Sequence, residues 1–115
     1  MDPEPFQVTP RPGSRDGLSI LHVKGAITTK TAEKFHEAFA ASTSPKIIID
    51  LTEVPSVDSM AIGALVRAFI ACHKSGRKLA LVGLNHRIRN VLSITGVELL
   101  FDTYATIREA ESSLV

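Results

Sequence analysis

The sequence has few of the residues on which covalent or metal-based architectures depend. Its 115 residues include one cysteine, Cys72, and no tryptophan, and only 5% of them are aromatic. A lone cysteine cannot form an internal disulfide or supply a thiolate cluster, which is typical of a reducing compartment. The 4 histidines lie on separate predicted elements without metal-site spacing, and no phosphate-binding glycine motif is present. We therefore expect no metal and no cofactor.

Long apolar runs and an excess of one charge are also missing. No apolar run approaches the roughly 20 residues of a membrane span, and the N-terminal segment lacks the layout of a secretory signal. The 13 basic and 12 acidic residues leave a net charge of +1, so electrostatics gives no reason to expect nucleic acid or an anionic membrane as a partner. We expect a cytoplasmic protein forming one domain over residues 1–115, with residues 1–16 partly disordered because prolines interrupt them.

What the sequence does contain is an alternation of two hydrophobic periods. We expect strands at residues 6–9 (an edge strand), 18–24, 46–51, 78–84 and 99–101. We expect helices over residues 28–40 with Thr28 or Thr29 as cap, from Ile62 to Gly76, from Asn85 as cap to Gly96, and over residues 107–114. This order predicts an α/β fold with a mixed, mostly parallel sheet of four to five strands and about four helices.

The candidate functional residues follow from this topology, because sites in such sheets lie where strands lead into helices. Three loops meet that description, residues 25–29, 52–59 and 83–85. The second ends in Asp58 and Ser59, within VPSVDSMAIGALVRAF. Either residue could cap the following helix, contributing about 1 kcal/mol. Alternatively, the hydroxyl of Ser59 could be displayed for phosphorylation at the helix N-terminus, where a phosphate is tolerated. Pattern alone favours the cap and leaves both open.

Enzymatic chemistry finds little support in these loops. Ser59 is not part of a GxSxG elbow and has no evident triad partners. Asp50 ends an apolar strand, as a phosphate-accepting aspartate does in receiver domains, but the segment HVKGAITT offers no carboxylates for Mg²⁺. We therefore do not expect an enzyme, and an enzyme or small-ligand binder is the least supported alternative.

A longer segment, IIIDLTEVPSVDSMAIGALVRAF, contains an apolar strand ending in Asp-Leu, a short loop and an Asp-Ser pair opening a helix. This arrangement resembles the STAS domain, in particular the bacterial anti-sigma-factor antagonists, whose motif is D-S-[ST]-G-L-G. The resemblance extends over nearly the whole chain, through Gly25, Thr31-Ala32, Gly76 and VLSITGV. Here Met60, Ala61 and Ile62 replace the family's second hydroxyl residue, glycine and leucine, and Thr28 replaces an acidic residue of an earlier turn.

The resemblance implies a partner-switching protein. In that family an anti-sigma factor with serine kinase activity phosphorylates the serine that corresponds to Ser59, and phosphorylation prevents the complex. The implied partner-binding residues are Thr28, Thr29, Asp58, Met60, Ile62, Gly63 and Arg67. An alternative, which Met60 and Ala61 favour, is a scaffold or regulatory module that docks without phosphorylation in a signalling or transport complex. We expect a monomer or a weak dimer, since an edge strand could pair with another chain.

Overall fold

The computed structural model describes residues 6–114, which form a five-stranded sheet and four α-helices. In chain order the elements are β1 (Gln7–Pro12), β2 (Leu18–Lys24), α1 (Ala32–Ala40), β3 (Lys46–Glu53), α2 (Ser59–Lys74), β4 (Lys78–Val82), α3 (His86–Ile94), the short 3-10 helix η1 (Glu98–Leu100), β5 (Asp102–Tyr104) and α4 (Ile107–Ser113). The strands lie side by side in chain order, with β1 antiparallel to β2 and the other pairs parallel. This confirms the predicted mixed, mostly parallel α/β fold.

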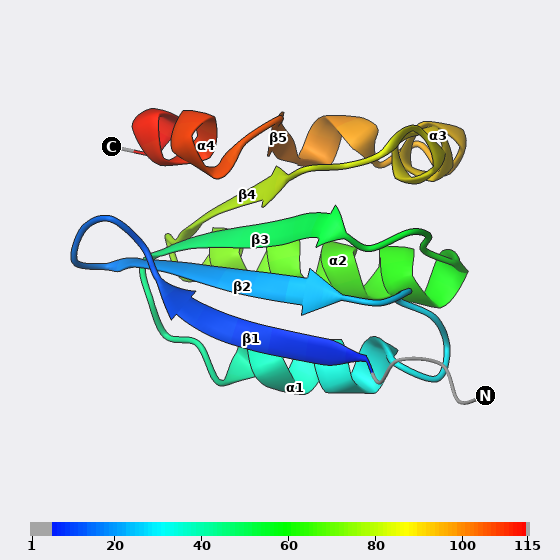
Figure 1. Cartoon of the computed structure of the whole chain (residues 1–115), viewed down its shortest axis with the longest axis horizontal. Coiled ribbons are helices and arrows are strands. Elements are labelled where there is room, and N and C mark those ends of the chain that lie inside the picture. Colours follow the sequence, from blue (N-terminus) through cyan, green and yellow to red (C-terminus); the bar gives the residue numbers. More distant parts are fainter. Residues whose placement is uncertain (1–5, 115) are drawn as a thin grey trace.

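Strand β3 occupies the centre of the sheet and is buried on both faces. Ile47, Ile49 and Leu51 point into the larger core, which α1 and α2 cover from behind the strands in Figure 1. Ile48 points to the opposite face, where Ala110 of α4 and the following Leu114 pack against it. A strand buried on both faces needs apolar residues at consecutive positions, which explains the unbroken isoleucine run of this segment.

Strand β1 extends further than the predicted edge strand at residues 6–9, because it includes Pro10 and Pro12. Prolines two residues apart lack their N–H groups on the same side of a strand, and an edge strand can turn that side away from its partner. Residues 7–12 pair continuously with β2. Part of the segment 1–16, for which we expect partial disorder, is thus a paired strand at residues 7–12, and residues 1–5 lie outside the described residues.

The predicted strand at residues 99–101 is wrong. Residues 98–100 form η1, and the strand that joins the sheet is β5, whose residues pair with residues 80–82 of β4. Between the two elements lies Phe101, a buried residue whose ring packs edge-on against Phe69 at 5.8 Å between centroids. Leu99 is 95% exposed. The apolar pair Leu99-Leu100 therefore imitates a strand signal, while Phe101 anchors the chain just before the real strand.

The start of one helix differs from the prediction, and two predicted helix caps are confirmed. Helix α1 has Thr31 as its N-cap residue rather than Thr28 or Thr29, and Thr28 instead opens a turn whose carbonyl accepts the N–H groups of Thr31 and Ala32. Helix α2 begins at Ser59 with Asp58 as its N-cap residue, as the predicted capping pair requires, and its apolar stripe starts at Ile62 within the helix. The predicted cap Asn85 is confirmed, because its Oδ1 accepts the N–H of Ile88 at 2.8 Å.

Gly83, directly after β4, combines two constraints. Its φ of +75° lies in the left-handed region, and a Cβ built there would lie 3.0 Å from Cα of Thr52 and against its hydroxyl. Gly76, after α2, has a similar φ of +72° but open space around the position of a Cβ. A comparison of alanine substitutions at the two glycines therefore distinguishes the cost of backbone strain, which both share, from the cost of steric contact, which only Gly83 has.

We expect Gly83→Ala to lower the free energy of unfolding by more than the about 1–2 kcal/mol that left-handed backbone costs a residue with a Cβ. Gly76→Ala, the matched control, should cost only that conformational part. Urea denaturation of both variants measures the difference. Equal losses would show that the Thr52 contact relaxes without cost.

Candidate functional site

Three loops meet at the carboxyl edge of the sheet, as the sequence predicted. The loop after β2 is joined to the loop after β3 by an isolated parallel bridge between Ile27 and Val57. The N–H of Ile27 donates to the carbonyl of Ser56 at 3.2 Å, and the N–H of Asp58 donates back to Ile27 at 3.2 Å. The side-chain amide of Asn85, after β4, donates to the carbonyls of residues 54 and 55 at 3.3 and 3.0 Å. These bonds hold the three loops together as one surface.

Asp58 is the N-cap residue of α2 and also ties the helix to the neighbouring loop. Its Oδ1 accepts the N–H of Ala61 at 3.0 Å, and its Oδ2 accepts the N–H of Thr29 at 3.0 Å and the Thr29 hydroxyl at 3.4 Å. The hydrogen bond from Ala61, with those from Thr29 and Met60, lowers the pKa of Asp58 despite the opposing effect of burial. The carboxylate form is thus the one that the folded chain stabilises.

Ser59, the next residue, is the first residue of α2 and is exposed. No hydrogen bond within residues 6–114 engages its hydroxyl. The two interpretations of the Asp58-Ser59 pair are therefore compatible, because Asp58 alone provides the side-chain cap. Ser59 presents a free hydroxyl at the end of the molecule where the three loops meet.

The other predicted partner-binding residues are divided between surface and core. Met60 is 49% exposed, and Gly63, Arg67 and Thr29 are also exposed, whereas Thr28 is partly buried. Ile62, by contrast, is 6% exposed and packs in the main core, so little of its side chain is accessible to a partner. Its position on the inner stripe of α2 explains the difference.

Ala61 is also fully buried. Its methyl group faces the core and does not lie where a partner would approach. The replacement of the family glycine by Ala61 therefore gives no steric argument against a partner, and Met60 is the motif departure that changes the exposed surface.

A cluster that the sequence did not reveal lies on the outer face of β2 and β3. The ring of His22 contacts Asp50 through Nδ1 at 2.9 Å and Glu53 through Nε2 at 2.5 Å. Burial raises the pKa of the Asp50 carboxyl, but hydrogen bonds from Thr52 and His22 outweigh it and leave that pKa below its ordinary value. Because the histidines lie on separate predicted elements, the sequence had suggested that each of them is isolated from other titratable groups. Only the register, in which His22 lies opposite Asp50, brings these groups together.

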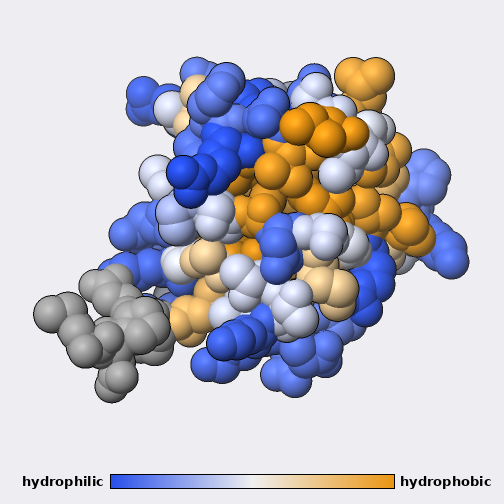
Figure 2. All heavy atoms as spheres, turned by 90° about the vertical axis from the view of Figure 1, so that its right-hand side faces the viewer, coloured by the Kyte–Doolittle hydropathy of each residue, from blue (hydrophilic) through white to orange (hydrophobic). Residues whose placement is uncertain are grey.

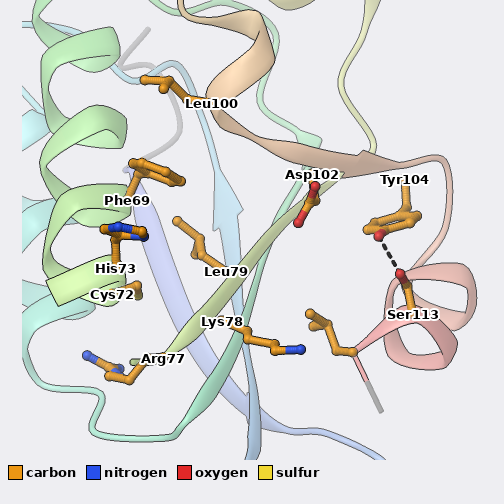
Figure 3. A pocket seen from close by; sticks show the side chains of 11 residues that line it. Phe69, Cys72, His73, Arg77, Lys78, Leu79, Leu100, Asp102, Tyr104 and Ser113 are labelled. Atoms are coloured by element: carbon orange, nitrogen blue, oxygen red, sulfur yellow. Dashed lines mark hydrogen bonds between the residues drawn. The ribbon is translucent and has the colours of Figure 1, made fainter. Parts of the chain in front are cut away.

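A pocket of about 230 Å³ lies at the other end of the molecule, beyond the C-terminal part of α2 (Figure 3). Its apolar wall includes Phe69, Leu79 and Leu100, and the hydroxyls of Tyr104 and Ser113 are hydrogen-bonded at 2.5 Å on the opposite side. Since it lies at the amino ends of β4 and β5, it is separate from the three-loop surface.

Within residues 6–114, no group of three or more histidine, cysteine, aspartate or glutamate side chains is arranged to hold a metal ion. None of the helices in this part of the chain has the length and hydropathy that a membrane span requires.

The fold is that of a small α/β domain, and its candidate site is the surface of three loops around the N-terminus of α2. The family model of the STAS domain matches residues 10–110. The chain therefore belongs to the STAS domain family.

Relatives agree with this assignment. An anti-sigma-B factor antagonist of Listeria monocytogenes is 35% identical over 80 residues, which cover 67% of this chain and 70% of that protein. A Thermotoga maritima protein provisionally named an anti-sigma factor antagonist is 37% identical over 65 residues, which cover 56% of this chain and 58% of that protein. The match thus spans less than two thirds of the second relative.

Among solved structures, the phosphorylated form of the Bacillus cell fate determinant SpoIIAA superposes with a TM-score of 0.70 at 15% identity. The superposition covers 96% of this chain and all of SpoIIAA (100%). At this level of identity the likeness shows that the two chains share a fold.

Removing the Asp58 cap tests how the loop surface is held. We expect Asp58→Ala to lower the free energy of unfolding at pH 7 by about 1 kcal/mol. Asp58→Asn should retain most of the cap. Because the pKa of Asp58 is lower in the folded state, its charge-dependent stabilisation is complete above the unfolded value of about 3.9 and is lost as the pH falls through the lower folded value.

Urea denaturation at a series of pH values measures both effects. The difference in stability between the wild-type chain and Asp58→Asn should shrink in acid, and this comparison cancels the titration of the other carboxylates. A constant difference down to pH 3 would contradict the assigned role of the ionised carboxylate.

Proposed function

We propose that this chain is an anti-sigma-factor antagonist, that it binds an anti-sigma factor with serine kinase activity, and that phosphorylation of Ser59 prevents the complex. The observation that carries the proposal is the free, exposed hydroxyl of Ser59 beside a cap residue that is already fully engaged. The names of the Listeria and Thermotoga relatives, and the phosphorylated form of SpoIIAA, support it.

The proposed contact surface is the exposed side of the first turns of α2 together with Thr29. Ser59, Gly63 and Arg67 follow one another at four-residue spacing, which places them along one side of the helix. Met60 adds an exposed apolar side chain beside them. Figure 2, which faces this end of the molecule, has a hydrophobic area in its upper half. Exposed apolar surface of this kind is typical of protein contacts.

The effect of phosphorylation follows from charge. A phosphate adds about −1.5 to −2 charges, and the carboxylate of Asp58 already occupies the N–H of Ala61 that could otherwise receive it. The new charge would therefore stay on the surface, next to another negative group. A partner covering Met60 and Ser59 would have to desolvate that charge, which is costly without a matching cation.

Phosphorylation can be tested with a candidate anti-sigma kinase and Mg-ATP. We expect intact mass and peptide mapping to show one added phosphate at Ser59 in the wild-type chain, none in Ser59→Ala, and an unchanged phosphate in the matched control Ser56→Ala, from the same loop. Ser59→Asp should weaken the complex by on the order of tenfold relative to the neutral Ser59→Asn, because only the first adds charge.

The alternative function, a scaffold that docks without phosphorylation, rests on Met60 in place of the family's second hydroxyl residue. It predicts a tight complex that is indifferent to ATP, with equal affinity for Ser59→Asp and Ser59→Asn. That result would overturn the switch and leave the contact surface in place. Phosphate at another residue would overturn the site.

Gly63 provides an independent test of the surface. It lies inside α2, where glycine is unfavourable by roughly 0.5–1 kcal/mol relative to alanine, and a Cβ there would meet nothing within 4 Å. Packing inside the domain thus gives no reason for a glycine at this position. Close approach of a partner would give one.

We expect Gly63→Ala to raise the free energy of unfolding by roughly 0.5–1 kcal/mol and to weaken the complex with the anti-sigma factor. Ala71→Gly, at an exposed position near the other end of the same helix, should do the reverse to stability and leave binding unchanged. Urea denaturation and titration calorimetry measure the two quantities. Unchanged affinity of Gly63→Ala would remove Gly63 from the contact surface.

A further inference from the structure

The His22 cluster has an unusual arrangement of hydrogen-bonding groups. Both ring nitrogens face carboxylate oxygens, Nδ1 toward Asp50 at 2.9 Å and Nε2 toward Glu53 at 2.5 Å. The side chains of His22 and Asp50 are 11% and 7% exposed, whereas that of Glu53 is 50% exposed. An irregularity in the β2–β3 register, after which Lys24 pairs with Glu53, brings Glu53 to the face of the sheet on which His22 lies.

The charge state of the His22 ring follows from which of these nitrogen and oxygen atoms must donate a proton to its partner. A neutral imidazole has one N–H donor and one acceptor, and an ionised carboxylate only accepts. Asp50 is held in its ionised form, because two hydrogen bonds from Thr52 also reach its Oδ1. When Glu53 is also ionised, its oxygen can only accept, so the facing Nε2 at 2.5 Å must donate as well. Both contacts are therefore hydrogen bonds only when both ring nitrogens carry protons.

We propose that His22 is held as an imidazolium that bridges Asp50 and Glu53, so that the junction between the carboxyl ends of β2 and β3 is sensitive to pH. Deprotonation of the ring removes one of the two donors, and the bond to the more exposed Glu53 is the one expected to open.

The surroundings of His22 contain few other charges. In its row across the sheet the neighbours are Thr9 of β1, Asp50 of β3, Val82 of β4 and Tyr104 of β5. On the same face, Arg11 and Lys24 lie one row away on either side. Helix α4 covers the row of Ile20 and Ile48, and its Glu111 accepts a hydrogen bond from the N–H of Ser14. Among the described residues, the hydrogen-bonding contacts of the ring are therefore the two carboxylates.

The bridge lies at the base of the loops that carry Asp58 and Ser59. The N–H of Gly25 donates to the carbonyl of Glu53 at 3.0 Å, and the bridge between Ile27 and Val57 follows directly. Opening of the Glu53 contact would therefore increase the mobility of residues 25–29, whose Thr29 holds the carboxylate of Asp58. The protonation of His22 would in this way change the mobility of the three-loop surface.

The test compares the wild-type chain with Glu53→Gln, since a glutamine amide can donate to the unprotonated nitrogen of a neutral ring. We expect ¹⁵N spectra at pH 7 to show two protonated ring nitrogens for His22 in the wild-type chain and one in Glu53→Gln. Hydrogen exchange of the amides of residues 25–29, corrected for its intrinsic pH dependence, should lose protection as the pH is raised in the wild-type chain only.

One protonated ring nitrogen in the wild-type chain at pH 7 would overturn the proposal, and so would an identical pH dependence of protection in the two proteins. A circular dichroism spectrum of Glu53→Gln that matches the wild-type spectrum establishes that both are folded. Neither readout needs a partner protein. Failure here is therefore distinguishable from failure of the proposed anti-sigma function.

Discussion

Burial of β3 on both faces is the constraint on which the rest of the fold depends. A central strand with Ile47, Ile48 and Ile49 fully buried needs apolar cover on each side. Parallel neighbours meet this need, because each crossover returns through a helix that packs on the sheet. The same crossovers bring the carboxyl ends of β2, β3 and β4 to one edge. The loop surface around Ser59 is thus a consequence of how β3 is buried.

The convergence of the loops becomes a defined surface because short polar side chains each make two connections. Asp58 caps α2 and holds Thr29, and Asn85 caps α3 and holds the loop after β3. In both cases a single side chain fixes a helix start relative to another loop. Helix α2 consequently begins at a fixed position, and the hydroxyl of its first residue, Ser59, has no hydrogen bond within residues 6–114.

The elements that could be predicted from the sequence are those in which one local signal dominates. The isoleucine run of β3 and the cap Asn85 are of this kind, because burial and capping depend on residues close together in the chain. The predicted strand at residues 99–101 was wrong because the apolar character of Leu99 does not reveal whether its side chain is exposed. That exposure depends on how Phe101 packs against Phe69. A hydrophobic pattern identifies residues that can be buried, but it cannot by itself tell which of them the fold buries and which it leaves exposed.

The candidate site shows the same limit. Asp58 and Ser59 were recognisable as a pair, but only the helix start distinguishes the cap from the free hydroxyl. Ile62 belongs to the motif that the resemblance assigns to the partner, but it lies two residues after Met60 and, at about 100° per residue, points to the opposite, buried side of the helix. The contacts of His22 depend on strand register, and Asp50 lies 28 residues away along the chain. Register is a property of the whole sheet, so no local pattern could have predicted this cluster.

The division of roles between Asp58 and Ser59 bears on how a switch at this position would operate. Asp58 is part of the internal bonding, so a change there would alter the loops themselves. Ser59 has no internal partner within residues 6–114, so a phosphate on its hydroxyl would break no existing hydrogen bond. The folded chain would keep its loops and helix start, and the added charge would act on whatever covers the surface. A regulated contact of this kind changes affinity through electrostatics and needs no conformational change in the domain.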